Sequence, residues 1–238
     1  MKSSLIDLQK RGYIQKDDLL PYQNYSYSDL LKLLDSNLPY QRTCAIQLLV
    51  TKFSLTEELT SLFLNKLVNE KSLYTKIALC DALATGTVEA VSLMLPYLGK
   101  IGSNQYRELP VTPSKKKSFP LPRDIIARTL GNMSPSIISI LDQAIQTVNE
   151  NQLSELLDGY GMLIFYHPEL ATTQRFQNIK QLILTHDESS LITYKAILCL
   201  SAFPLLENEE FLVQIISSVQ TLILRKEAER SLKLIQNH

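Results

Sequence analysis

The stretch that decides the fold is Lys76-Ile-Ala-Leu-Cys-Asp-Ala-Leu, residues 76–83, in which a basic residue opens a run of small and apolar residues. The pattern recurs as Arg42-Thr-Cys-Ala-Ile-Gln-Leu-Leu, Arg123-Asp-Ile-Ile-Ala-Arg-Thr-Leu and Lys195-Ala-Ile-Leu-Cys-Leu-Ser-Ala, with a weaker copy after Arg225. The copies at 42 and 76 are 34 residues apart, and those at 123 and 195 are 72 apart, or two periods of 36. A repeat of this length indicates helical pairs that bury their faces by stacking on neighbouring pairs.

Helical periodicity also dominates between these copies. Leu59, Leu62, Phe63 and Leu67 follow one another at intervals of three and four residues, the spacing of an apolar stripe that faces a core. No convincing alternation of apolar and polar residues predicts a strand. With 238 residues, of which 45% are hydrophobic, the chain is long enough to bury a sizeable core. We therefore expect an all-α protein.

A helix, a polar turn, a basic residue and a second helix rich in small residues together resemble the HEAT repeat, and residues 76–83 are similar to its bacterial lyase-like variety. The resemblance covers about residues 26–236 as six pairs and implies a right-handed α-solenoid. It implies that residues 1–25 cap an array over 26–238, and that the basic residues support the turns between repeats: Arg42, Lys76, Arg123 and Lys195. The fourth pair departs from the pattern, because its second helix, 149–166, lacks the basic residue.

The composition argues against several classes of partner. Basic and acidic residues balance at 24 each, so a nucleic acid is a possible but not a favoured partner. No apolar stretch approaches the roughly 20 residues that span a bilayer, and residues 1–10 do not resemble a signal peptide, so we expect no membrane partner. The three cysteines lack the spacing of a zinc site or of a disulfide framework. A cytoplasmic location fits best.

Residues 102–120 interrupt the repeat, with three prolines and no helical periodicity. From 100 to 123 the chain has six basic residues against Glu108 alone. Long loops in compact domains are often either functional or disordered. Two interpretations stay open: a mobile surface loop that its lysines keep solvated, or a basic arm that docks an acidic protein surface or a phosphate-bearing ligand. The arm would use Tyr106, Arg107, Lys115, Lys116, Lys117 and Arg123.

The second helices of such a solenoid line its concave face, which repeat proteins use for binding. Asp81 and Arg128 occupy equivalent positions there, either as an ion pair between repeats or, with Asp124 nearby, as polar groups that face a ligand. Tyr160 and Tyr166 of the fourth pair are placed for the same groove. Gly159 and Gly161 weaken that helix by roughly 1 kcal/mol each, which indicates close packing or close approach of a ligand.

The chain carries no recognisable catalytic motif: it has no Gly-rich phosphate loop, no G-x-S-x-G elbow and no H-E-x-x-H sequence. We expect no catalytic residue, no cofactor and no metal site. A HEAT-like family of DNA glycosylases has a similar length, but it holds the damaged base with tryptophans, and this chain has none. A chromophore lyase resembles the chain only in architecture.

The leading hypothesis is thus a non-catalytic scaffold for protein–protein interaction. It would bind a partner of unknown identity through the concave groove and the basic inserted loop. The alternative is a nucleic-acid-associated HEAT-like protein that works through the same loop.

Overall fold

The structure is a computed structural model that describes residues 4–237. These residues form α-helices and short 3-10 helices, and no strand occurs among them, so the predicted all-α class is confirmed. The chain divides into two compact units, Met1–Leu93 and Met94–His238. The continuous array over 26–238 stays a prediction. No helix between residues 4 and 237 has both the length and the apolar character that crossing a membrane requires.

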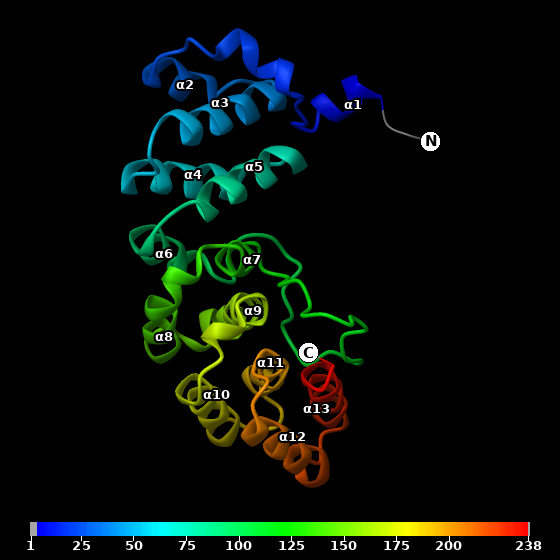
Figure 1. The fold of residues 1–238 in the computed structure, drawn as a ribbon. Helices are drawn as coiled ribbons and strands as arrows, with labels where there is room; N and C mark the ends of the chain where they lie inside the picture. The colour runs from blue at the N-terminus through cyan, green and yellow to red at the C-terminus, as the bar shows by residue number, and fades with distance from the viewer. Residues whose placement is uncertain (1–3, 238) are drawn as a thin grey trace. The chain divides into compact units, whose positions relative to one another are not determined.

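The first unit is built from helices that pack in pairs (Figure 1). Helix α2 packs on α3, α4 packs on α5, and α3 and α5 contact each other, so the second helices of two neighbouring pairs stack. The elements of this unit are α1 (Leu5–Gln9), η1 (Lys16–Tyr22), α2 (Tyr27–Leu33), α3 (Pro39–Lys52), α4 (Glu57–Asn69), α5 (Leu73–Ala84) and the greater part of α6 (Val88–Met94).

The segment before α2 lies against the second helices of this unit. Residues of η1 contact α3, and the Cys44 thiol of α3 donates a hydrogen bond to the carbonyl of Asp18. The ring of Tyr13 packs edge-on against Tyr74 of α5. Gly12 adopts a positive φ of 88°, and a β-carbon there would come within 2.3 Å of Thr75 Oγ1. The close approach therefore depends on glycine at this position.

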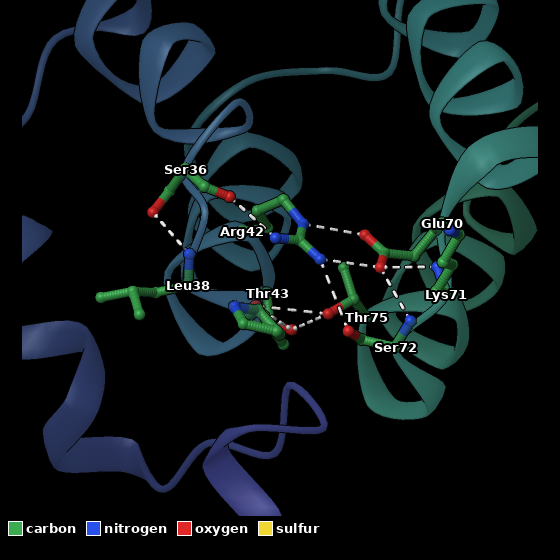
Figure 2. Close-up of polar contacts among 9 residues, drawn as sticks. Ser36, Leu38, Arg42, Thr43, Glu70, Lys71, Ser72 and Thr75 are labelled. Atoms are coloured by element: carbon green, nitrogen blue, oxygen red, sulfur yellow. Dashed lines mark hydrogen bonds and ion pairs between the residues drawn. The ribbon is translucent and has the colours of Figure 1, made fainter.

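The predicted turn-supporting role is confirmed for Arg42, which joins two turns (Figure 2). Its guanidinium donates to both carboxylate oxygens of Glu70, at 2.9 and 2.7 Å, and to the carbonyl of Ser36 at 2.7 Å. Glu70 in turn accepts the backbone N–H groups of Lys71 and Ser72, which precede α5. The same carboxylate thus satisfies backbone donors at a helix start and an arginine from the preceding pair.

The second unit begins with α7 and then repeats the pairwise arrangement three times along the chain. Helices α7, α9, α11 and α13 contact one another in that order, while α8, α10 and α12 pack on α9, α11 and α13 respectively. The elements are η2 (Leu95–Tyr97), α7 (Ile125–Gly131), η3 (Pro135–Ile137), α8 (Ile138–Thr147), α9 (Glu150–Tyr166), η4 (Pro168–Leu170), α10 (Thr173–Thr185), α11 (Leu191–Leu200), α12 (Leu206–Ser218) and α13 (Leu222–Ile235).

Helix α9 is the central helix of this unit, because every residue from Leu153 to Phe165 is buried. It runs without a break through both glycines. A β-carbon on Gly159 would lie 2.4 Å from the carbonyl oxygen of Ala127, so the glycine lets α9 approach the backbone of α7. A β-carbon on Gly161 would lie 2.6 Å from the ring of Phe119. Close packing, rather than approach of a ligand, accounts for both glycines.

The prediction that the basic residue supports a turn is wrong for Arg123 and Lys195. Arg123 lies in the insertion, where its guanidinium carbon is 4.0 Å from the centre of the Tyr106 ring. Lys195 is completely buried inside the second unit and pairs with two carboxylates of α9. Lys76 lies half-buried on α5.

Candidate functional site

The insertion is the longest non-helical segment of the second unit, from the end of η2 at Tyr97 to the start of α7 at Ile125. Its two ends are tied together by the buried carboxylate of Asp124, the N-cap residue of α7. One oxygen accepts the N–H of Ala127 at 2.8 Å, as an N-cap does. The other accepts the N–H of Gly99 at 3.1 Å and the side-chain amide of Gln105 at 2.9 Å. Asp124, predicted as a candidate binding residue, thus has its side chain engaged within the loop.

Further along, Phe119 anchors the insertion on α9. Its side chain is 3% exposed and its ring lies 5.7 Å from that of Phe165. The space it occupies exists because position 161 is a glycine. Burying a phenylalanine stabilises the contact by about 1.5–3 kcal/mol.

A third contact joins the insertion to α13. The backbone N–H of Ser114 donates to Glu227 at 3.4 Å, and the same carboxylate accepts the hydroxyl of Tyr194 at 3.2 Å. Arg230 donates to the other oxygen of Glu227 at 2.6 Å. Burial raises the pKa of Glu227, although Arg230 acts in the opposite direction. The insertion is seen beside α13 in Figure 1.

Two predicted loop residues, Tyr106 and Arg123, come together. The Arg123 guanidinium covers one face of the Tyr106 ring, in cation–π geometry. The Tyr106 ring packs edge-on against Tyr194 of α11, with ring centres 6.3 Å apart. The insertion therefore contacts α9, α11 and α13, which are three successive second helices of the unit.

The other basic residues of the insertion are left on its surface. Arg107, Lys115, Lys116 and Lys117 are exposed, and none of them forms an ion pair with any residue in the described part of the chain. Backbone contacts and Phe119 hold the segment, so these charges take no part in anchoring it.

Two cavities open on either side of Tyr106, one of about 430 Å³ and one of about 540 Å³. The larger lies between the insertion and the α9–α11 pair, and its lining includes Asp158, Lys195 and Leu198. The smaller is lined by Glu155 and by the residues that begin α9 and α11. Both volumes fall within the range typical of small-molecule sites.

A buried ion cluster lies between the linings of these cavities. Lys195 Nζ is 2.8 Å from a carboxylate oxygen of Glu155 and 3.1 Å from one of Asp158, and the lysine side chain is 1% exposed. These distances define two ion pairs, but the geometry is not that of a hydrogen bond, and Lys195 Nζ has no hydrogen-bond partner within residues 4–237. Glu155 Oε2 is buried with no hydrogen-bond partner in residues 4–237. Two carboxylates thus share one ammonium group.

Electrostatics in this cluster are set by burial. Burial raises the pKa of Glu155, against the attraction of Lys195, and the neighbouring Asp158 raises it further. The pKa of Asp158 is raised for the same reason. Burial alone would lower the pKa of Lys195, but Asp158 and Glu155 raise it above its usual value. Lys195 is therefore a charged, structural cation and not an amine nucleophile at neutral pH.

Four predicted site residues remain. Asp81 is exposed on α5 in the first unit. Arg128 donates twice to the carbonyl of Pro122, at 3.0 and 2.7 Å. Tyr160 is completely buried and donates to Asp142 of α8 at 2.7 Å, so it has no surface to offer a ligand. Tyr166 is 53% exposed and lines a separate pocket with His167.

Sequence reasoning missed Glu155, Asp158 and Glu227, and it gave Lys195 a different role. A signal was present, because two carboxylates three residues apart stand in a mostly apolar stretch of α9, and a buried charge requires a partner. Lys195 stands in a similarly apolar run. The described residues contain no group of three or more metal-ligating side chains. Burial raises the pKa of Cys44 to about 12 and also raises that of Cys199, which disfavours the reactive thiolate form of both.

No family model matches the chain, and no curated protein matches it in sequence. Among solved structures, the chain is similar to one described as the crystal structure of an engineered protein, at 16% identity and a TM-score of 0.42. That similarity covers 89% of this chain and 96% of the other. A likeness at this level carries no argument about fold type or function.

Proposed function

We propose that this protein is a non-catalytic scaffold for protein–protein interaction, built as a right-handed α-solenoid of the HEAT type. It binds an acidic segment of a partner protein through the basic inserted loop and the helices that the loop contacts. The observation that carries this proposal is the combination of a docked backbone with unpaired charges in the insertion. Phe119, Asp124 and the Ser114–Glu227 contact hold the segment, while its lysines form no ion pair within residues 4–237.

This combination supports binding for a physical reason. A mobile loop would lose conformational entropy when a partner ordered it, about 1–2 kcal/mol for each residue fixed. A loop already packed on α9, α11 and α13 avoids most of that loss, which is the advantage of preorganisation. The lysines at 115–117 and Arg107 then form a locally cationic surface in a chain of zero net charge, which speeds and orients the approach of an acidic partner.

The stacked second helices and the absence of a recognisable catalytic motif also support this proposal. A cytoplasmic location belongs to the same proposal, and it is supported by the number and spacing of the three cysteines, which do not suggest a disulfide framework. A nucleic acid would use the same cations, and it is the competing outcome of the experiment below.

The test is affinity capture from the native cell with the full chain and with a Lys115→Glu/Lys116→Glu/Lys117→Glu variant. The matched control is Lys16→Glu/Lys71→Glu/Lys226→Glu, which makes the same change of net charge at exposed lysines elsewhere. We expect one acidic protein to be captured reproducibly by the wild type and the control, with or without nuclease treatment, and lost with the loop variant. Capture that both variants retain, or that nuclease abolishes, contradicts the proposal.

A further inference from the structure

The larger cavity, beneath the insertion, has an uneven distribution of charge. Its lining on the loop side includes three basic residues, Lys115, Lys116 and Arg123, and on the helix side Asp158 and Lys195. Lys115, Lys116 and Arg123 form no ion pair with any of residues 4–237, and the Arg123 guanidinium contacts the face of Tyr106 and the carbonyl of Asn104. Cationic groups therefore gather on one wall.

The opposite wall offers hydrogen-bonding groups and no excess of positive charge. Lys195 is balanced by Glu155 and Asp158, which together leave the buried cluster with one more negative than positive charge when both are ionised. Asp158 is nearly buried and lines the cavity, so its carboxylate is placed to accept hydrogen bonds from a bound molecule. Tyr106 and Tyr194 also line the cavity.

We propose that this cavity binds a small phosphate monoester that carries hydroxyl groups. The phosphate lies toward Lys115, Lys116 and Arg123, whose side chains form charge-assisted hydrogen bonds with its oxygens. The hydroxyl groups of the organic part lie toward Asp158. A volume of about 540 Å³ accommodates a phosphorylated sugar or a nucleoside monophosphate, and it excludes a folded macromolecule.

The site overlaps the protein-docking surface proposed above at two lysines, but it extends beneath the insertion to α9 and α11. Lys115 and Lys116 line the cavity, whereas Lys117, their neighbour in the chain, does not. A ligand in the cavity would also link the insertion to α9 and α11, so its binding stabilises the docked position of the loop.

The experiment is isothermal titration of the full chain at low salt with three phosphate esters of increasing size: glycerol phosphate, ribose phosphate and adenosine monophosphate. Inorganic phosphate and unphosphorylated ribose are titrated in parallel. We expect at least one ester to bind, more tightly than inorganic phosphate, and ribose not to bind. The Lys115→Gln/Lys116→Gln variant should bind that ester about tenfold or more weakly, as expected for the loss of hydrogen bonds to charged groups.

The matched control is Lys71→Gln/Lys226→Gln, which removes the same charge from exposed lysines outside the cavity lining and should leave the affinity within about twofold. Equal thermal stability of the two variants shows that both are folded. The proposal is overturned if none of the esters binds, if inorganic phosphate binds as tightly as every ester, or if the control loses as much affinity as the cavity variant.

Discussion

Arg42 in the first unit and Lys195 in the second stand at the same place in two copies of one sequence pattern, yet the structure uses them differently. The side chain of Arg42 lies near the surface and is 18% exposed, and it joins two turns through a bidentate contact with Glu70 (Figure 2). Lys195 is fully enclosed and balances two carboxylates from the adjacent helix. A basic residue at the start of a repeat helix therefore has no single role, and its contacts depend on the neighbouring helix.

The difference follows from the helix on the neighbouring side. Glu70 lies outside the regular helices and also accepts two backbone N–H groups, so it stays well hydrogen-bonded whatever Arg42 does. Glu155 and Asp158 lie in the centre of α9, where every neighbour is buried and no backbone donor is free. We therefore expect the second unit to depend on its cation much more than the first unit does.

Lys195→Met should have the largest effect, lowering the free energy of unfolding by about 3–5 kcal/mol, because it leaves two buried carboxylates without a counter-charge. Urea denaturation measures this. Lys76→Met, at the equivalent position of another repeat, should change stability by less than about 0.5 kcal/mol because Lys76 is half-exposed.

A rescue separates charge from packing at this position. Adding Glu155→Gln and Asp158→Asn to Lys195→Met removes the uncompensated charges and should recover most of the lost stability. If the triple variant stays as unstable as Lys195→Met, then the stability depends on the packing of the Lys195 side chain of α11 and not on the ion cluster.

Arg42→Ala should have an intermediate effect, about 1–3 kcal/mol, since hydrogen bonds to a charged partner are lost while Glu70 keeps its backbone donors. Arg42→Lys should recover only part of this stability, because an ammonium group cannot reproduce the bidentate hydrogen bonds of the guanidinium. Full recovery with lysine would show that only the positive charge matters at this turn. Arg42 and Lys195 would then differ only in how deeply they are buried.

The two regions should respond to acid in opposite directions. Burial alone would raise the pKa of Glu70, but hydrogen bonds from Arg42 and Ser72 bring it below the ordinary value of 4.5. Its contribution to stability is present above that value and is lost as the pH falls through the lower, folded pKa. The pKa of Glu155 is raised by burial, so protonation is easier in the folded protein, and the cost of its buried charge is relieved as the pH falls toward 4.5.

Stability measured from neutral pH to well below 4.5 tests this through two variants. The free energy of unfolding of the wild type minus that of Glu70→Gln should fall as the pH is lowered. The same difference for Glu155→Gln should rise. Each slope should be at most about 1.4 kcal/mol per pH unit. Parallel pH profiles for the two variants would contradict the assignment of opposite electrostatic roles.

Substitution of the loop lysines should have the smallest effect on stability, because they are more exposed than Lys195 and Arg42. Lys115→Glu/Lys116→Glu/Lys117→Glu should change the free energy of unfolding by less than about 0.5 kcal/mol, because none of these residues contributes an ion pair within residues 4–237. A loss comparable to that of Arg42→Ala would mean that the lysines anchor the insertion.

The helical pairs could be predicted from the sequence because period and apolar spacing are local properties. The non-helical insertion at 102–120 was predictable for the same reason, from its prolines and missing periodicity. The contacts of Phe119 with α9 and of Ser114 with Glu227 could not, because they join residues far apart in the chain. Tyr160 was expected in a groove, but its hydroxyl is bonded to Asp142, a partner that only the packing of α8 on α9 reveals.

The central claim is that the insertion is docked on α9, α11 and α13 and so presents preorganised binding groups. Hydrogen–deuterium exchange over residues 102–120 of the full chain measures this most directly. We predict that the amides of Ser114 and of the residues around Phe119 exchange clearly more slowly than in an unstructured peptide, and that Phe119→Ala, which removes the main anchor, accelerates them without affecting α3. Exchange of the whole segment at the rate of an unstructured peptide in the wild type would contradict the claim.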